Sequence, residues 1–128
     1  MVLVVDDEPL VLKSAQRMFE LRGFEVLTAS DGPSALLVSR SAKRLDLLVT
    51  DVCLPGEDGR LLAMELRETR PGLPVLFISG LTSDTATFGL PTAGTWAFLA
   101  KPFTGRELDA HLAVLLGPVL PGGPARRG

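Results

Sequence analysis

Five short apolar runs, separated by segments with helical spacing, constrain the fold of this chain more than any other feature of its sequence. The runs have the length and composition of strands buried on both faces: VLVV (2–5), FEVLTA (24–29), LDLLVTD (45–51), VLFIS (75–79) and WAFLA (96–100). The intervening segments predict helices over residues 10–21, 33–43, 60–68 and 105–116. Strands and helices that alternate in this way predict an α/β fold with a parallel sheet, because parallel strands need crossover connections.

One of the expected helices has an unfavourable sequence. The segment SDTATFGLPTAG (83–94) lies where a fourth helix should connect two strands, but Gly89 and Pro91 both oppose a helix interior. We therefore expect the fourth helix to be short or irregular. The final segment, GPVLPGGPARRG (117–128), is dominated by glycine and proline and has no periodic pattern. The sequence thus predicts one domain over residues 1–116, followed by a flexible tail or linker stub over 117–128.

The composition excludes several classes of protein. The chain has 128 residues, 46% of them hydrophobic, which is enough for one core without disulfides or structural metals. Its single cysteine, Cys53, cannot form an internal disulfide, as expected in a reducing compartment. A net charge of −2 argues against a nucleic-acid surface, and no apolar run approaches the length of a membrane span. We therefore expect a cytoplasmic protein that binds neither nucleic acid nor membrane.

Polar side chains stand at the ends of four of the predicted strands. Asp6 and Asp7 follow the first strand, Asp51 ends the third, Ser79 ends the fourth and Lys101 follows the fifth. In an open parallel sheet the carboxyl ends of the strands form one edge, and ligands bind in the crevice there. We expect these five residues to share one cleft.

The five side chains together suit the binding of a metal cation and a phosphoryl group. Three neighbouring carboxylates cannot all remain ionised without a cation, and oxygen ligands of this kind favour Mg²⁺. Lys101 would add a second positive charge, and Ser79 a hydroxyl donor. Positive charges and donors placed in this way match the oxygens of a phosphoryl group during its transfer. An aspartate pair after a strand also suits a helix N-terminus, so the joint placement of the five carries the prediction, rather than any one residue.

Four motifs, VVDDEP, TDVCLPGEDG, ISG and FLAKPF, occur in an order and spacing that resemble the receiver domain of two-component response regulators. The resemblance covers residues 1 to about 116. It implies a (βα)5 flavodoxin-like fold, a three-layer sandwich whose five-stranded parallel sheet has the strand order 2-1-3-4-5. It further implies a phosphorelay signalling domain that is not an enzyme beyond its own phosphoryl transfer and slow autodephosphorylation.

The resemblance assigns a role to each site residue. Asp51 matches the phospho-acceptor, which takes the phosphoryl group from a histidine kinase or phosphotransfer protein. Mg²⁺ would be bound by Asp7 and Asp51 directly, by Asp6 through water, and by the backbone carbonyl of Cys53. Lys101 would contact the phosphoryl oxygens.

The same resemblance implies a switch. Ser79 would turn towards the phosphoryl group, and the aromatic ring of Phe98 would follow it, so that a downstream protein reads the altered surface. The Lys101–Pro102 peptide bond is a candidate for the cis isomer. Cys53 and Leu81, which would flank the phosphoryl group, are poorly suited to orient a hydrolytic water, so the phosphoryl group should be long-lived.

Three alternatives remain open on the sequence alone. A degenerate receiver could act as an unphosphorylated protein-interaction module, although all five site residues are present. A small Mg²⁺-dependent phosphatase would need a general acid two residues after the nucleophile, where this chain has Cys53. Dinucleotide binding is disfavoured, because DDEP stands where a glycine-rich turn would be required. The sequence leaves open whether the domain acts alone or belongs to a larger regulator or hybrid kinase.

Overall fold

The structure is a computed structural model, in which residues 1–80 and 95–117 are described. The strands are β1 (Val2–Val5), β2 (Val26–Ala29), β3 (Leu47–Asp51), β4 (Cys53–Leu54), β5 (Glu57–Asp58), β6 (Val75–Ser79) and β7 (Trp96–Ala100). The helices within these residues are α1 (Pro9–Glu20), α2 (Gly32–Ser39), α3 (Gly59–Thr69) and α5 (Gly105–Leu116). The segment 83–94, where an irregular helix is expected, and the predicted tail after residue 117 lie outside the described residues.

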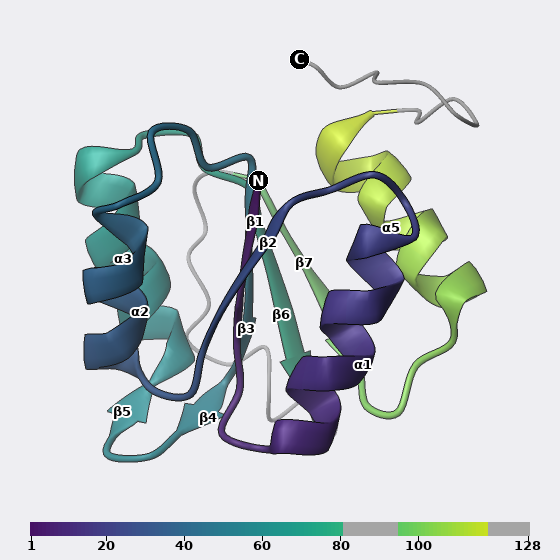
Figure 1. Ribbon diagram of the computed structural model, residues 1–128, viewed down its shortest axis with the longest axis horizontal. Coiled ribbons are helices and arrows are strands. Elements are labelled where there is room, and N and C mark those ends of the chain that lie inside the picture. The colour runs from purple at the N-terminus through teal and green to yellow at the C-terminus, as the bar shows by residue number, and fades with distance from the viewer. Residues whose placement is uncertain (81–94, 118–128) are drawn as a thin grey trace.

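Five parallel strands form the central sheet in the order β2-β1-β3-β6-β7. Counted within this sheet alone, β6 and β7 are the fourth and fifth strands, so the succession is the predicted 2-1-3-4-5. The labels differ because β4 and β5 pair with each other outside the sheet. Helices α2 and α3 cover one face of the sheet and α1 and α5 the other (Figure 1). The predicted α/β sandwich is therefore confirmed.

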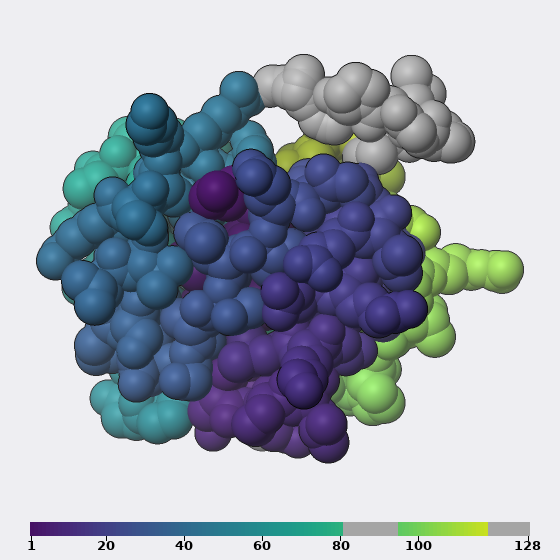
Figure 2. Space-filling view, viewed as in Figure 1, coloured from purple at the N-terminus to yellow at the C-terminus, as the bar shows by residue number. Residues whose placement is uncertain are grey.

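Each face of the sheet buries its own apolar cluster, because side chains alternate along a strand. On the α2 and α3 side, Leu3, Leu48 and Phe77 are fully buried in one cluster. On the α1 and α5 side, Val4 and Ile78 belong to the other, together with Phe19 of α1 and Leu108 of α5. In the space-filling view, the purple and blue N-terminal part of the chain covers the sheet on the side of β2 (Figure 2).

The second helix ends earlier than the sequence predicts, at Ser39 instead of near residue 43. Three consecutive backbone bonds of the i to i+3 type close its end, the last from the Ala42 N–H to the Ser39 carbonyl. Nη2 of Arg70, at the end of α3, donates to the carbonyls of both Ser39 and Ala42. A side chain distant in sequence thus satisfies carbonyl groups that a longer helix would have satisfied internally.

The segment LPGEDG, expected to be a loop, contains part of a small hairpin. Strands β4 and β5 pair antiparallel, with Leu54 opposite Glu57, and Gly56 between them adopts a φ of 68°. The Asp58 carboxylate then accepts a hydrogen bond from the backbone N–H of Arg60 and caps α3. The hairpin therefore leads the chain directly from the end of β3 into α3.

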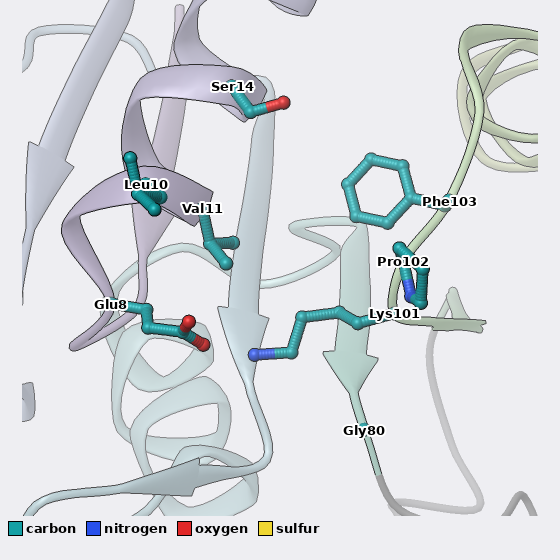
Figure 3. Close-up of a pocket in the computed structure, with 8 residues that line it drawn as sticks. All are labelled: Glu8, Leu10, Val11, Ser14, Gly80, Lys101, Pro102 and Phe103. Carbon is teal, nitrogen blue, oxygen red and sulfur yellow. The ribbon is translucent and has the colours of Figure 1, made fainter.

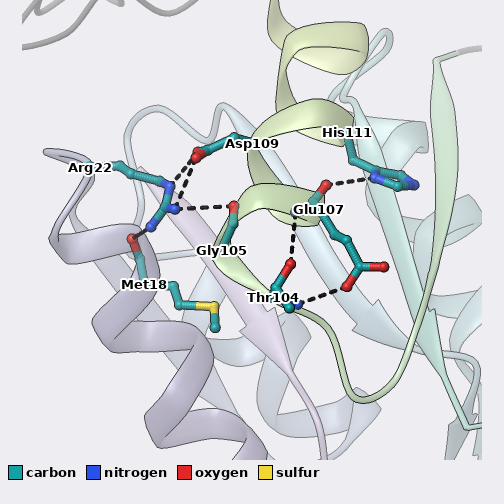
Figure 4. Close-up of polar contacts among 7 residues, drawn as sticks. All are labelled: Met18, Arg22, Thr104, Gly105, Glu107, Asp109 and His111. Carbon is teal, nitrogen blue, oxygen red and sulfur yellow. Dashed lines mark hydrogen bonds and ion pairs between the residues drawn. The ribbon is translucent and has the colours of Figure 1, made fainter.

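Arg22 joins the end of α1 to the start of α5 (Figure 4). Its guanidinium forms an ion pair with Asp109 and donates to the carbonyls of Met18, at 2.7 Å, and Gly105, at 3.2 Å. Thr104 caps α5, because its hydroxyl accepts from the Glu107 N–H while the Glu107 carboxylate accepts from the Thr104 N–H. These contacts fix how α5 begins after the sheet ends.

Among the described residues, none of the helices is both long and apolar enough to cross a membrane.

A carboxyl group lies at the junction of the hairpin with α2. Oε1 of Glu57 is inaccessible to solvent and has no hydrogen-bond partner. It lies over Gly32, where an added Cβ atom would be 1.3 Å from it. Burial is the largest influence on Glu57 and raises its pKa above the ordinary value. The charge of Glu65, a hydrogen bond with Glu65 and the charge of Asp31 raise this pKa further. Folding therefore makes the Glu57 carboxyl harder to ionise than it is in the unfolded chain.

Replacing Glu57 by glutamine should remove a pH-dependent part of the stability. Because the pKa is raised in the folded state, the stability that Glu57 contributes is present below the unfolded pKa of about 4.3 and is lost as the pH rises through the folded pKa. Relative to Glu57→Gln, the wild type should thus lose free energy of unfolding as the pH rises above the unfolded pKa and through the raised folded pKa. Urea unfolding at several pH values measures this difference. Glu68→Gln, at an exposed position of α3, is the matched control.

Candidate functional site

The strand alternation directs three charged side chains to the same face of the sheet. Asp6 continues the series of Val2 and Val4, and Asp51 continues that of Leu47 and Val49, all of which face α1 and α5. Lys101 follows Leu99 in the same way. Because β1, β3 and β7 are parallel, these side chains leave the sheet at its carboxyl edge.

Lys101 lies between two carboxylates. Its Nζ atom is 2.7 Å from Oδ2 of Asp51 and 3.1 Å from Oδ2 of Asp6. All three groups are withdrawn from solvent, since the Asp6 side chain is 0% exposed and those of Asp51 and Lys101 are 9% and 15% exposed. One ammonium group therefore bridges three strands that are far apart in sequence, as the strand-end pattern predicts.

The pKa values of Asp6 and Lys101 are both raised, but for different physical reasons. Burial is the largest influence on Asp6 and raises its pKa, outweighing the hydrogen bonds from the Glu8 N–H and from Lys101. Burial alone would lower the pKa of Lys101, but the hydrogen bonds and charges of Asp51 and Asp6 outweigh it and raise that pKa above its ordinary value. Lys101 is therefore firmly charged, whereas the charge of Asp6 depends on the ammonium beside it.

A third carboxylate, that of Asp7, completes an acidic cluster. One oxygen atom from each of Asp6, Asp7 and Asp51 lies within 4.8 Å of the other two. Asp7 is exposed, whereas Asp6 and Asp51 are buried, so the cluster opens towards solvent on one side. A set of carboxylate oxygens with an open side fits a hard divalent cation that keeps some of its water.

The backbone that follows β3 forms a hydrogen bond with the Asp51 carboxylate. The N–H of Cys53 donates to Oδ1 of Asp51 at 2.9 Å, so both oxygens of Asp51 accept hydrogen bonds, one from the main chain and one from Lys101. Cys53 is exposed, and its thiol is free. Its backbone therefore lies beside the acidic cluster, whereas its side chain is accessible from outside.

Ser79 and Phe98, predicted as the switch pair, lie on the other face of the sheet. Phe98 is half-buried in the cluster on the α2 and α3 side, and Ser79 continues the series of Val75 and Phe77 on that side. Ser79 is 1% exposed, and its carbonyl accepts a hydrogen bond from the Lys101 N–H at 2.8 Å. The peptide bond between Lys101 and Pro102 is cis, the isomer expected at this position.

A pocket of about 460 Å³ lies next to the acidic cluster, between the start of α1 and the segment that follows β7 (Figure 3). The carboxylate of Glu8 and the ammonium of Lys101 point into its lower part in this view, and the ring of Phe103 lies above them. The remaining lining residues are Leu10, Val11, Ser14, Gly80 and Pro102. The pocket therefore combines an apolar wall with a charged end at the site.

Two residues near Asp51 were not predicted as part of the site. Thr50 is completely buried, and its hydroxyl donates to the Asp51 carbonyl. Gly59, the first residue of α3, lies against the same carbonyl. The only sequence signal for Thr50 is a hydroxyl residue within an otherwise apolar strand. Gly59 gives no signal that separates it from an ordinary turn glycine.

The family described as "Response regulator receiver domain" matches residues 2–113 of the chain. The chain belongs to this family. The match spans the described sheet and all the residues of the charged site, so the resemblance predicted from the four motifs is confirmed. As a receiver domain, the chain is a signalling domain of a two-component system and not an enzyme of the usual kind.

Several known proteins are similar to this receiver domain in sequence, in fold or in both. It is 42% identical over 116 residues to the transcriptional regulatory protein PrrA of Mycobacterium tuberculosis, covering 90% of this chain and 49% of that protein. It is 36% identical over 116 residues to the sensor kinase CckA of Brucella abortus, covering 90% of this chain and 12% of that kinase. The solved structure of the chemotaxis response regulator CheY4 of Vibrio cholerae has a TM-score of 0.79 at 30% identity, covering 90% and 97% of the two chains. The chain therefore spans half or less of the length of these two curated relatives.

Removing the central ammonium should destabilise the domain in a pH-dependent way. In Lys101→Met, the buried Asp6 and Asp51 lose their shared partner, which should cost roughly 3 kcal/mol of unfolding free energy at neutral pH. Without the ammonium, the pKa of Asp6 should rise further, so protonation at lower pH should relieve part of the loss. The deficit relative to the wild type should thus be larger at pH 7.5 than at pH 5.

Urea unfolding at these two pH values checks this expectation. Lys13→Met, at an exposed position of α1, is the matched control and should change stability little at either pH. A deficit for Lys101→Met that is equal at both pH values would contradict the electrostatic account of the bridge.

Proposed function

We propose that this receiver domain accepts a phosphoryl group on Asp51 from the phosphohistidine of a histidine kinase or phosphotransfer protein, and that the modification switches a surface read by a downstream protein. The observation that carries the proposal is the position of Asp51, 2.7 Å from the Lys101 ammonium and within the carboxylate cluster formed with Asp6 and Asp7. The buried Asp51 carboxylate thus lies beside a cation that can balance added negative charge, and the cluster around it opens to solvent at Asp7.

The chemistry uses the Asp51 carboxylate as a nucleophile. One of its oxygens would form a bond to phosphorus, while the bond between phosphorus and the donor nitrogen breaks and its electron pair remains on the donor imidazole. The phosphoryl group brings negative charge to the place where the Lys101 Nζ atom already binds Asp51. Lys101 would then bind the phosphoryl oxygens, a stronger partner than the carboxylate alone.

Mg²⁺ is the proposed cofactor. Asp7 and Asp51 would bind it directly and Asp6 through water, with the Cys53 backbone carbonyl as a further ligand. The ion supplies positive charge that offsets the charge of the phosphoryl oxygens during transfer. The oxygen donors and the open side of the cluster at Asp7 support this choice.

The charged pocket beside α1 suits the approach of the donor. Leu10, at the pocket, is 77% exposed, so a partner protein could cover this apolar wall while its phosphohistidine reaches Lys101. The two curated relatives described above are a transcriptional regulator and a sensor kinase, which supports partnership with a kinase and a protein output. We propose no nucleic-acid or membrane contact for this domain, and a cytoplasmic location where the exposed Cys53 thiol stays reduced.

The switch would run through Ser79 and Phe98. Phosphoryl oxygens beside the carboxyl end of β6 would attract the Ser79 hydroxyl, and the half-buried Phe98 would repack on the same face of the sheet. Such a change shifts the balance between two existing conformations. We propose that the signalling domain extends to residue 116, the end of α5, and that residues 117–128 are a tail or linker stub.

We further propose that the phosphoryl group is lost slowly. The Cys53 side chain, at one flanking position, is a weak hydrogen-bonding group and orients water poorly. Leu81, the other flanking residue named from the sequence, lies outside the described residues.

Phosphorylation is tested by intact mass after incubation with acetyl phosphate and Mg²⁺. The wild type should gain one phosphoryl group, and Asp51→Asn should gain none, because the amide has no nucleophilic carboxylate oxygen. Asp31→Asn, which alters a carboxylate that caps α2 and is not in the acidic cluster, is the matched control and should be modified as the wild type is. Equal modification of Asp51→Asn and the wild type would rule out Asp51 as the acceptor, and an unmodified wild type would favour a degenerate receiver.

Metal binding is tested by calorimetric titration and by thermal unfolding. Mg²⁺ should bind the wild type and raise its Tm, because a ligand that binds only the folded state stabilises it. Asp7→Asn should weaken Mg²⁺ binding roughly ten-fold or more, since it removes a charged ligand while leaving the buried Lys101 bridge in place. Glu8→Gln, one residue further along, should bind Mg²⁺ nearly as the wild type does. Unchanged Mg²⁺ affinity in Asp7→Asn would contradict the proposed ligand set.

A further inference from the structure

Thr50 is a buried polar residue for which the proposed phosphoryl transfer has no use. It is 0% exposed and precedes Asp51 in β3, where every other residue before the acceptor is apolar. The alternation of the strand directs its side chain to the α2 and α3 side, with Leu48 and Val52. Burying a hydroxyl among apolar groups costs free energy unless the hydroxyl is hydrogen-bonded. A valine would have nearly the same shape, so the hydroxyl calls for an explanation.

The hydroxyl binds the main chain of the acceptor residue itself. Oγ1 of Thr50 donates to the carbonyl oxygen of Asp51 at 3.0 Å. Gly59 packs closely against this carbonyl and the hydroxyl, because a Cβ atom added there would lie 1.9 Å from the Asp51 oxygen and 3.0 Å from Oγ1 of Thr50. The Asp51 carbonyl is thus in contact with both a hydroxyl donor and the first residue of α3.

The peptide groups that follow are fixed by a series of hydrogen bonds. The N–H of Val52 donates to the Ile78 carbonyl at 3.1 Å, and the N–H of Gly59 donates to the Val52 carbonyl at 2.8 Å. The N–H of Cys53 then donates to Oδ1 of the Asp51 carboxylate at 2.9 Å. The Asp51–Val52 peptide, together with the Val52–Cys53 peptide that Gly59 holds, therefore sets where the Cys53 N–H points, and with it one oxygen of the Asp51 carboxylate.

We propose that Thr50 is a positioning residue for phosphoryl transfer, whose hydroxyl sets the orientation of the Asp51–Val52 peptide and thereby the direction of the Asp51 carboxylate. The proposal rests on the proposed function of Asp51 as the phospho-acceptor. Thr50 touches neither the phosphoryl group nor the metal cluster and acts through the main chain. Small changes in the direction of a nucleophile have large effects on rate, because the reacting atoms must be aligned.

The role of the hydroxyl can be separated from that of the side-chain volume. Thr50→Val keeps the branched shape and removes the hydroxyl, whereas Thr50→Ser keeps the hydroxyl and removes the methyl group. If the hydroxyl positions Asp51, Thr50→Ser should be phosphorylated at a rate within about two-fold of that of the wild type. Thr50→Val should be phosphorylated roughly ten-fold more slowly than the wild type. A residue that serves only packing would give the opposite order, because serine leaves the larger void.

Two measurements on the full chain decide the matter. The first is the rate of phosphoryl incorporation from acetyl phosphate at saturating Mg²⁺. The second is the amide proton resonance of Cys53 in the unmodified protein, which reports its bond to Asp51 and needs no phosphorylation. The resonance should coincide in the wild type and Thr50→Ser and should move upfield in Thr50→Val as this bond weakens.

Ser39→Ala is the matched control. Ser39 is also buried, 5% exposed, and its hydroxyl donates to the Leu36 carbonyl at 2.7 Å, but it lies at the end of α2. It should leave both the rate and the Cys53 resonance unchanged. If Thr50→Val fails to fold, the pair Thr50→Ser and Thr50→Ala, which differ only in the hydroxyl, gives the same comparison.

A wild-type rate and an unshifted Cys53 resonance in folded Thr50→Val would overturn the proposal, as would equal slowing in Thr50→Ser and Thr50→Val. Should the wild type itself take no phosphoryl group, the proposed function fails on that result alone. The Cys53 resonance would then still show whether the Thr50 hydroxyl orients the Asp51 carboxylate.

Discussion

The structure of the site depends on one buried ammonium group shared by two carboxylates. Lys101 joins the ends of β1, β3 and β7 by binding Asp6 and Asp51, and all three side chains are largely withdrawn from solvent. Neither carboxylate is well placed without this charge, because burial disfavours an ionised group that has no partner. The domain therefore keeps, at one edge of its sheet, an electrostatic balance that depends on a single side chain. Any added negative charge must change the partners of that side chain, which is a suitable basis for a signalling domain.

The two layers of helices give the site its two sides. Asp6, Asp51 and Lys101 leave the sheet towards α1 and α5, where the pocket beside Leu10 and Phe103 opens. On the other side of the sheet lie α2 and α3 with the residues proposed as the switch. A phosphoryl group held at the sheet edge would thus lie beside both layers. Phosphorylation on the α1 and α5 side would then affect how side chains pack on the α2 and α3 side. The edge of a parallel sheet is a natural place for such coupling, because every strand ends there.

The polar groups beneath the site have different physical consequences. Thr50 is bonded to the main chain of the acceptor, so its hydroxyl is satisfied and makes the surrounding backbone more rigid. Glu57, in contrast, keeps one buried oxygen without a hydrogen bond, and its environment makes the carboxyl harder to ionise. Thr50 contacts the main chain of Asp51, whereas the Glu57 oxygen lies over Gly32 at the start of α2. Thr50 lies within β3 and Glu57 in the hairpin that joins β3 to α3, so both are close in sequence to Asp51.

The sequence by itself determined the order of strands and helices, the parallel sheet and the convergence of Asp6, Asp7, Asp51 and Lys101, because strand alternation and the common edge of parallel strands are local or topological properties. It did not determine that α2 ends at Ser39, since the carbonyls of Ser39 and Ala42 accept hydrogen bonds from Arg70, at the end of another helix. Nor did it indicate the β4–β5 hairpin or the roles of Glu57 and Gly59. Those features depend on which atoms meet across the packed layers, and only the tertiary structure decides such distances and burial.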